Sequence, residues 1–370
     1  MRIGFDGKRF FHNNTGLGNY SRSLIKVVSD YFSENEYLLY NPKQTNKYTL
    51  KDYNKSVIEI LPESYFLRRF KSLWRLFFVS KTIKNQNIAI FHGLSGEIPL
   101  GLPYQIKKVV TIHDLIFIRY PNLYSYFDRK IHFFKFKYAA QNSDIVVAIS
   151  QQTKNDIVSF LGIAEEKVKV IYQGCNSVYK DVFTKNQIEI TLQKYKLPNE
   201  YILNVGTIEK RKNLLIILKS ITNTNKNLVV IGKKTAYFNK VWNYIVENNI
   251  EKQVFFLKDL SLQEMAIIYQ KATLFIYPSI FEGFGIPIIE ALYSKTPVIT
   301  SIGSCFSEAG GSHSIYINPE SDEELRQAID SLWENQVKRD EMREKGFEFV
   351  QKFNDETVAQ NWQNLYQSLL

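Results

Sequence analysis

The chain has little of several features that mark common functional classes. Its 370 residues include two cysteines, Cys175 and Cys305, which provide neither a disulfide framework nor a zinc-ligand spacing. This cysteine content fits a reducing cytoplasm. No stretch approaches the roughly 20 apolar residues that a membrane-spanning helix needs. The opening residues, MRIGFDGKRF, carry charges where a signal peptide needs an apolar core, so they predict a first strand instead.

Two common phosphate-site motifs are also missing from the sequence. No Asp-x-Asp occurs, so a metal-bridged nucleotide site of that kind is not expected. No Gly-x-x-x-x-Gly-Lys-Ser/Thr loop occurs either, which argues against an ATPase. We therefore expect neither a metal nor a cofactor. A bound diphosphate would have to be neutralised by basic side chains and helix N-termini.

The residues that are present indicate an α/β protein. Apolar residues make up 45% of the chain, enough for buried cores. Short apolar runs alternate with helix-like segments, as in parallel sheets joined by right-handed crossovers. Two such series flank a turn-rich stretch near 174–196 and predict two doubly wound, Rossmann-like domains, at 1–182 and 183–355. The expected strands are 2–6, 37–41, 56–61, 88–93, 107–114 and 144–150 in the first series, and 201–206, 227–232, 253–258, 273–279 and 296–301 in the second.

Positive charge is concentrated in the first half of the chain. Residues 1–180 hold 26 Lys and Arg against 14 Asp and Glu, whereas residues 181–370 hold 21 against 23. A basic half predicts an anionic partner there, such as a membrane surface, a lipid-linked phosphate or nucleic acid, although Lys-rich usage for solubility is an open alternative. Residues 64–79, SYFLRRFKSLWRLFFV, interleave basic and aromatic side chains, as a helix on an anionic membrane does. A crossover helix packing its apolar stripe on the sheet would show the same pattern.

The stretch 277–300, YPSIFEGFGIPIIEALYSKTPVIT, contains the most informative motif. Glu282 and Glu290 stand eight residues apart around a Gly-Phe-Gly-Ile-Pro turn, between a predicted buried strand and a predicted helix. Glycines there let a ligand approach the backbone, and the N–H groups at the helix start favour an anion. Two carboxylates add acceptors for sugar or ribose hydroxyls. This arrangement suits a nucleotide-sugar, although such turns also occur with a purely structural role.

Other polar residues follow the ends of predicted strands, where ligands bind in open α/β sheets. Arg211 and Lys212 lie in GTIEKRKN before a predicted helix, where a bound diphosphate would offset their unfavourable position at a helix start. An exposed basic loop is the alternative. Gly16 and Gly18 open another helix, and His113 ends a strand, where it would contact a sugar hydroxyl or pair with Asp114 as an ordinary buried histidine.

Taken together, these motifs resemble the GT-B retaining glycosyltransferases of family 4. The resemblance spans nearly the whole chain and rests on GLGNY, IHDL, AISQQTKNDI, VGTIEKRKN, FEGFGIPIIEAL and, more loosely, SCFSEAGG with INPES. The family often has proline where this chain has Ser307. The resemblance implies an α/β fold of two facing Rossmann-like, doubly wound domains with a cleft between them. It also implies a last helix, at 356–370, that crosses back to the first domain.

The resemblance also implies roles for individual residues. Arg211 and Lys212 would bind the donor diphosphate, Glu290 the ribose, and Glu282 the sugar hydroxyls. The residues expected to act in catalysis are His113, Glu282, Arg211 and Lys212. Those expected to bind the donor are Gly16, Gly18, Gly206, Arg211, Lys212, Phe284, Gly285, Ile286 and Glu290.

The implied function is retaining, metal-independent transfer of a sugar from a nucleotide-diphosphate sugar. The expected acceptor is a glycan or a polyprenyl-diphosphate-linked glycan of surface-polysaccharide biosynthesis, at the cytoplasmic face of an anionic membrane, with no nucleic acid as a partner. Likeness to bacterial surface-polysaccharide mannosyltransferases favours mannose. Two alternatives stay open: a non-catalytic nucleotide or nucleic-acid binder, which would not need Glu282 and Glu290, and a nucleotide-sugar epimerase on a related fold.

Overall fold

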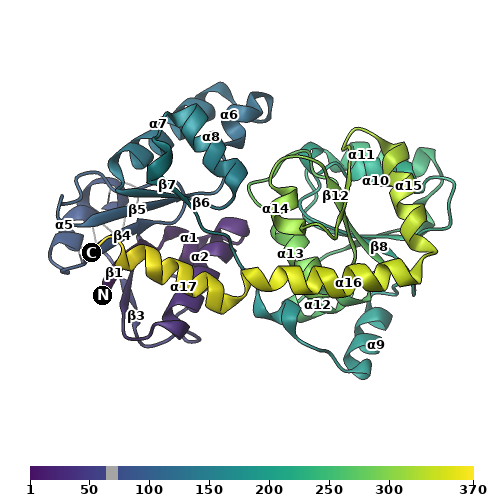
Figure 1. Cartoon of the computed structure of the whole chain (residues 1–370), viewed down its shortest axis with the longest axis horizontal. Helices are drawn as coiled ribbons and strands as arrows, with labels where there is room; N and C mark the ends of the chain where they lie inside the picture. The colour runs from purple at the N-terminus through teal and green to yellow at the C-terminus, as the bar shows by residue number, and fades with distance from the viewer. Residues whose placement is uncertain (64–73) are drawn as a thin grey trace. The chain divides into compact units, whose positions relative to one another are not determined.

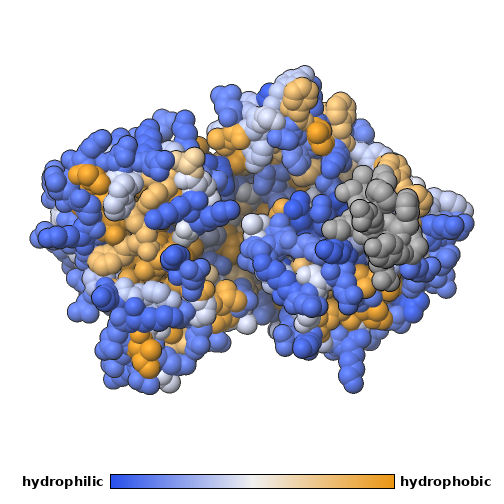
Figure 2. Space-filling view, turned by 180° about the vertical axis from the view of Figure 1, so that it is seen from behind, coloured by the Kyte–Doolittle hydropathy of each residue, from blue (hydrophilic) through white to orange (hydrophobic). Residues whose placement is uncertain are grey.

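The computed structural model describes residues 1–63 and 74–370, and these form two compact units (Figure 1). Unit 1 contains Met1–Gly174 together with Phe353–Leu370, and unit 2 contains Cys175–Lys352. The units divide after Gly174, eight residues before the division expected from the sequence. Hydrophilic side chains cover much of the face drawn in Figure 2, with apolar ones between them.

Unit 1 is built on a parallel sheet that, among the described residues, has seven strands in the order β3-β2-β1-β4-β5-β6-β7. The strands are β1 (Arg2–Asp6), β2 (Glu36–Tyr40), β3 (Val57–Ile60), β4 (Ile90–Gly93), β5 (Lys107–Ile112), β6 (Ile145–Ala148) and β7 (Val168–Val170). The helices are α1 (Lys8–His12), α2 (Gly16–Tyr31), η1 (Trp74–Phe78), α5 (Val79–Lys84), α6 (Ile116–Arg119), η2 (Pro121–Leu123), α7 (Tyr126–Asn142), α8 (Gln151–Leu161), η3 (Glu165–Lys167) and α17 (Asp355–Gln367).

Unit 2 repeats this plan with a six-stranded parallel sheet in the order β10-β9-β8-β11-β12-β13. The strands are β8 (Ile202–Val205), β9 (Leu228–Ile231), β10 (Val254–Leu257), β11 (Leu274–Tyr277), β12 (Val298–Ser301) and β13 (Ile315–Ile317). The helices are η4 (Ser177–Lys180), α9 (Lys185–Lys194), η5 (Lys210–Lys212), α10 (Leu214–Ile221), α11 (Phe238–Glu247), η6 (Glu251–Gln253), α12 (Leu262–Lys271), α13 (Ile286–Tyr293), α14 (Phe306–Gly310), α15 (Asp322–Trp333), α16 (Gln336–Val350) and η7 (Gln351–Phe353).

The two sheets confirm the expected fold of paired Rossmann-like α/β units. Each strand expected from an apolar run is present, because strands covered by helices on both faces are apolar along their whole length. β8, β9 and β11 are continuously apolar or nearly so, and their side chains are almost entirely buried. The sequence did not predict strands β7 and β13. Each has only three residues, and polar or half-buried side chains interrupt its apolar pattern.

Both sheets reverse their strand order once. In unit 1 the reversal lies between β1 and β4, and in unit 2 between β8 and β11. At such a point the connections leave in opposite directions, and a crevice forms outside the carboxyl ends of the two strands. The loops after β8 and β11 are therefore the places in unit 2 to look for a ligand site.

The last helix, α17, returns the chain to unit 1 and packs against α2 (Figure 1). Trp362 is 2% exposed, and its ring lies 4.7 Å from the ring of His92 and 5.5 Å from that of Tyr366. The Tyr366 hydroxyl is hydrogen-bonded to Nδ1 of His92 at 2.8 Å. Burial lowers the pKa of His92 to about 3, so this ring is neutral inside the core.

The stretch 64–79, expected to lie on a membrane or pack in the core, falls partly outside the described residues, which resume at Trp74. Trp74 is 1% exposed and belongs to the core. Arg75, which the sequence placed on a membrane-facing side, is instead paired internally with Asp6 at 2.8 Å and with Glu97. Arg75 donates through Nε to Asp6, at the end of β1, and through Nη2 to Glu97, in the loop after β4, so its planar guanidinium bridges two carboxylates in place of solvent.

We expect Trp362→Ala to lower the free energy of unfolding of unit 1 by about 3–5 kcal/mol, because the truncation leaves a cavity between α17 and the sheet. Urea titration followed by circular dichroism measures this loss. Trp242→Ala is the matched control, because Trp242 is 43% exposed and its truncation should cost less than about 1 kcal/mol. Equal losses in the two variants would contradict the role of α17 as a core element.

Candidate functional site

The turn after β8 carries the basic pair expected from the sequence. Gly206 ends the strand with φ +150°, a conformation that L side chains rarely adopt. Arg211 and Lys212 follow in η5, and Asn213, with φ +58°, ends that turn immediately before α10. The Asn213 side-chain amide donates hydrogen bonds to the carbonyls of Pro319 at 2.7 Å and Pro278 at 3.3 Å. The turn is thereby tied to the loops that follow β13 and β11.

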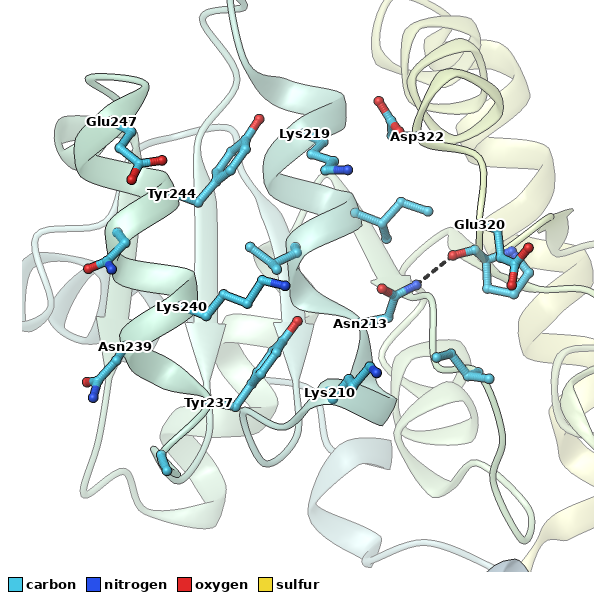
Figure 3. Close-up of a pocket in the computed structure, with 16 residues that line it drawn as sticks. Lys210, Asn213, Lys219, Tyr237, Asn239, Lys240, Tyr244, Glu247, Glu320 and Asp322 are labelled. Carbon is cyan, nitrogen blue, oxygen red and sulfur yellow. Dashed lines mark hydrogen bonds between the residues drawn. The ribbon is translucent and has the colours of Figure 1, made fainter. Parts of the chain in front are cut away.

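One side of this turn borders a hollow of about 930 Å³ between α10 and α11 (Figure 3). Its charged lining residues are Lys210, Lys219, Lys240, Glu247, Glu320 and Asp322, with Tyr237 and Tyr244 beside them. Positive and negative side chains balance there, so the hollow has no electrostatic preference for an anion. The site residues expected from the sequence are not among those that line it.

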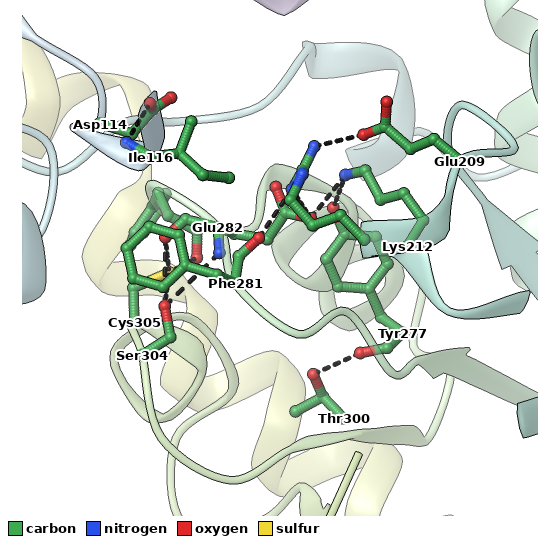
Figure 4. A network of polar contacts seen from close by, with 12 residues as sticks. Asp114, Ile116, Glu209, Lys212, Tyr277, Phe281, Glu282, Thr300, Ser304 and Cys305 are labelled. Carbon is green, nitrogen blue, oxygen red and sulfur yellow. Dashed lines mark hydrogen bonds and ion pairs between the residues drawn. The ribbon is translucent and has the colours of Figure 1, made fainter. Parts of the chain in front are cut away.

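The expected site residues Arg211, Lys212 and Glu282 meet in one cluster (Figure 4). Glu282 Oε1 lies 2.6 Å from Arg211 Nη1 and 2.7 Å from Lys212 Nζ. Lys212 Nζ also donates to the Tyr277 hydroxyl at 2.5 Å. The adjacent pairing of β8 and β11 brings the three side chains together, because their loops leave the same edge of the sheet.

The cluster is largely withdrawn from water. The side chains of Glu282, Lys212 and Arg211 are 12%, 15% and 20% exposed. Burial alone would raise the pKa of the Glu282 carboxyl, but the charges of Lys212 and Arg211 outweigh it and lower that pKa to about 2. One carboxylate shared by two cations leaves positive charge over, which the more exposed Glu209 partly offsets through a 2.6 Å contact with Arg211. With Glu209 counted, two cations face two carboxylates, so a further anion has to compete with these carboxylates for Arg211 and Lys212.

The glycine turn before α13 is held by side chains that the sequence analysis did not select. Cys305 Sγ donates to the carbonyls of Phe284 at 2.9 Å and Glu282 at 3.3 Å. Ser304 Oγ donates to the Glu282 carbonyl at 3.2 Å. Gly285, the N-cap of α13, has φ +106°, and Ile286 begins the helix. A buried cysteine and a loop serine carry no distinctive sequence pattern, so only the structure shows that they fix this turn.

Glu290 lies in separate surroundings from the cationic pair. The Tyr269 hydroxyl donates to Glu290 Oε2 at 3.0 Å, and the Tyr269 ring is edge-on to that of Tyr179 at 5.4 Å. Burial raises the pKa of Glu290 to about 7, and hydrogen bonds from the two tyrosines moderate the rise. Glu290 therefore changes charge near neutral pH, whereas Glu282 stays ionised.

The expected site residues of unit 1 have internal partners. His113 donates through Nε2 to the Leu94 carbonyl at 2.9 Å, and its ring is edge-on to Tyr20 at 4.5 Å. Burial lowers the pKa of His113 to about 4, so the ring is neutral at pH 7. A β-carbon on Gly18 would lie 1.9 Å from the Asn13 carbonyl oxygen, so Gly18 is required by packing. A β-carbon on Gly16 would meet open space, which leaves this position accessible to a ligand.

The described part of the chain has neither a metal-binding cluster nor a membrane-spanning helix. No group of three or more His, Cys, Asp or Glu side chains there is arranged to hold a metal ion. No helix in the same residues is long and apolar enough to cross a membrane.

Comparison with known proteins identifies the fold and the family. A family model described as Glycosyltransferase Family 4 matches residues 40–177, and one described as Glycosyl transferases group 1 matches residues 187–349. Together the two matches cover about four fifths of the chain. The chain belongs to the GT-B glycosyltransferases of family 4. The second match includes the cluster of Arg211, Lys212 and Glu282.

Curated relatives agree with this family, and solved structures share the fold. The glycosyltransferase is 32% identical over 234 residues to the O-antigen chain mannosyltransferase RfbU of Salmonella typhimurium, a match that spans 62% of each chain. It is 22% identical over the full length of both chains to O-antigen chain mannosyltransferase B of Escherichia coli. The sucrose-phosphate synthase of Thermosynechococcus elongatus shares the fold with a TM-score of 0.79 at 19% identity, covering 100% of this chain and 99% of that one. Anabaena HepE, solved with UDP and glucose, has a TM-score of 0.77 at 17% identity, with both chains fully covered.

We expect Glu282→Gln to destabilise unit 2 by about 3 kcal/mol, because it leaves two largely buried cations without their shared anion. The free energy of unfolding at pH 7 measures the effect. Glu209→Gln is the matched control: its carboxylate is 37% exposed, so the loss should stay below about 1 kcal/mol. A Glu282 variant as stable as the wild type would show that the cluster does not hold the two loops together.

Proposed function

We propose that this glycosyltransferase transfers a sugar from a nucleotide-diphosphate sugar, with unit 2 binding the donor. The observation that supports this most directly is the cluster of Arg211, Lys212 and Glu282 at the point where the strand order reverses. A donor diphosphate is an anion that Arg211 and Lys212 would bind in place of their carboxylate partners. The two O-antigen mannosyltransferases among the relatives favour mannose as the sugar.

An incoming diphosphate would compete with Glu282 for the same two cations. Arg211 offers a planar fork that matches phosphate oxygens, and Lys212 adds a compact charge. Once the cations turn to the diphosphate, Glu282 becomes available to accept hydrogen bonds from donor-sugar hydroxyls. When the glycosidic bond to phosphate breaks, negative charge builds on the leaving group, and the cations stabilise it more strongly than in the ground state.

The remaining parts of the donor site follow from the same assignment. Glu290 would accept hydrogen bonds from the ribose hydroxyls, with the turn of Phe284, Gly285 and Ile286 beside the phosphates. Gly206 and Gly16 would let the donor approach the backbone, and neutral His113 would contact the sugar.

We propose retention of the anomeric configuration and catalysis without a metal ion. The second proposal rests on the chemistry of the site, since Arg211 and Lys212 supply the charge that a metal ion would otherwise bring. Proton NMR of the first product formed determines the configuration. Activity that survives EDTA tests the role of metal.

The proposed acceptor is a glycan, or a glycan linked to polyprenyl diphosphate, in surface-polysaccharide biosynthesis. It would be used at the cytoplasmic face of the membrane. The names of the two O-antigen relatives support this class of acceptor. A nucleic-acid partner is not proposed, because the site is built for a diphosphate and for hydroxyl groups rather than for stacked bases.

Lys212→Ala should lower kcat by about 10²–10³-fold while the fold survives, because one of two charges facing the leaving phosphate is lost. The measurement is sugar transfer from a panel of GDP-, UDP- and dTDP-linked sugars, after thermal-shift screening of the same panel. Lys210→Ala is the matched control, since Lys210 is the exposed neighbour of the cluster. Full activity of the Lys212 variant would remove the donor-site assignment.

Donor affinity should rise with pH through neutrality. Ionised Glu290 accepts more hydrogen bonds from ribose than its neutral form, and its pKa in the unoccupied site is about 7. Below that pKa, KM for the donor should increase about tenfold per pH unit, and above it KM should level off. Glu290→Gln should raise KM at pH 8 and show no such dependence. Parallel pH profiles for the two proteins would contradict the role of Glu290 in donor binding.

A further inference from the structure

Helix α7 of unit 1 exposes a row of large apolar side chains. Phe127 is 76% exposed, Ile131 52% and Phe134 67%, and Tyr126 at the start of the helix is 58% exposed. Phe127, Ile131 and Phe134 are spaced by four and three residues, so they lie on one face of the helix. Figure 2 shows apolar side chains at the surface along the top of unit 1. We call Tyr126, Phe127, Ile131 and Phe134 the α7 stripe.

The orientation of the stripe is fixed by the opposite face of the helix. Ala139 and Ala140 are fully buried, and Phe133 and Phe136 pack against the same core. The Ser125 hydroxyl accepts a hydrogen bond from the Asp128 N–H at 3.2 Å, and the negative charge of Asp128 is favourable at the helix start. The helix cannot turn the stripe inward without unpacking its own core face.

Basic side chains flank the stripe. Lys130 and Lys137, seven residues apart, lie along one edge of it, and no described carboxylate pairs with either. Their ammonium groups lie 5.6 Å and 5.5 Å from the ring centroids of Tyr126 and Phe133. On the other edge, Lys135 contacts Glu97 at 3.3 Å. Aromatic and aliphatic side chains edged by lysines are typical of helices that lie in a membrane interface.

The charge of the whole unit points to the same partner. Unit 1 holds 25 Lys and Arg against 16 Asp and Glu, a balance of +9, so nearly all of the net charge of +10 belongs to it. An anionic surface attracts such a unit from a distance of about one Debye length, and each lysine near the surface adds to the attraction.

The exposed area of the α7 stripe distinguishes between two possible partners, another protein and a lipid bilayer. Four side chains exposed to this extent present roughly 400–500 Å² of apolar surface. A stable protein interface needs about 800 Å² from each partner and good shape complementarity, which a convex row of side chains on one helix does not supply. A bilayer interface needs neither, because lipids adapt their shape to the inserted side chains.

We propose that the α7 stripe inserts into the interface of an anionic lipid bilayer, with Lys130 and Lys137 at the level of the headgroups. This surface is separate in sequence from residues 64–79, whose membrane contact stays a prediction because they lie partly outside the described residues. The inference does not depend on the donor-site assignment, because none of the residues assigned to the donor belongs to the α7 stripe. If the acceptor is lipid-linked, the contact keeps unit 1 at the surface where that acceptor resides.

The test is sedimentation of the full chain with sucrose-loaded vesicles of phosphatidylcholine containing 30% phosphatidylglycerol. We expect the wild type to bind these vesicles and to bind pure phosphatidylcholine vesicles much more weakly. The variant F127Q/I131Q/F134Q should bind at least tenfold more weakly, with an unchanged melting temperature because the three side chains are exposed. The variant K130Q/K137Q should bind roughly 30-fold more weakly to the anionic vesicles.

A matched control removes exposed apolar side chains from unit 2. Val182, Ile190 and Val337 are 96%, 57% and 82% exposed, and V182Q/I190Q/V337Q should bind vesicles like the wild type. A wild type that stays in the supernatant, or a stripe variant that sediments equally well, overturns the proposal. So does a wild type that is dimeric by light scattering and becomes monomeric in the stripe variant without binding vesicles. Nucleotide-sugar binding measured on the same proteins tests the donor site separately.

Discussion

Unit 2 depends on one carboxylate that pairs with two cations. Glu282 lies between Arg211 and Lys212, and its contacts tie the loop after β11 to the turn after β8. Without a ligand, this carboxylate pairs with two largely buried cations. Burying these cations without a partner would lower the stability of the fold. With a diphosphate bound, the same cations would have a second anion to neutralise. In the proposed donor site, the stability of the unoccupied state and the affinity for the donor would therefore depend on competition for the same two side chains.

Unit 1 has a related cluster of charged side chains at the corresponding place in its sheet. Beside the reversal between β1 and β4, a single guanidinium, that of Arg75, is shared by two carboxylates, Asp6 and Glu97. Lys135 of α7 also contacts Glu97, so the polar centre of the unit is connected to the helix that carries the exposed stripe. The two units thus use the same strand topology with the same number of charges: Arg75 and Lys135 meet Asp6 and Glu97 in one, and Arg211 and Lys212 meet Glu282 and Glu209 in the other.

The sequence was sufficient to predict the two sheets and the meeting of Arg211, Lys212 and Glu282. Buried parallel strands produce apolar runs, and the carboxyl ends of adjacent strands meet at one edge. The sequence did not predict contacts between side chains that lie on distant helices and strands. Tyr269 and Cys305 look like ordinary core residues in the sequence, yet they hold Glu290 and the glycine turn. Arg75 stood in a stretch that resembled a membrane helix, because nothing local to it identifies Asp6 as its partner. The α7 stripe was missed because the core face of the same helix is also aromatic.

The return of α17 to unit 1 has a consequence for the order in which the chain folds during synthesis. Buried side chains of α17, Trp362 and Tyr366 among them, complete a core whose remaining members precede residue 175, so unit 1 lacks part of its core until residues 353–370 have been made. Unit 2 is continuous in sequence and lies wholly between these two parts. At 5–20 residues per second, roughly 10–35 s separate the synthesis of the two parts of unit 1. During that interval unit 2, although it is synthesised later, can finish folding before unit 1. The face of α2 that α17 will cover is meanwhile exposed to chaperones or to a premature partner.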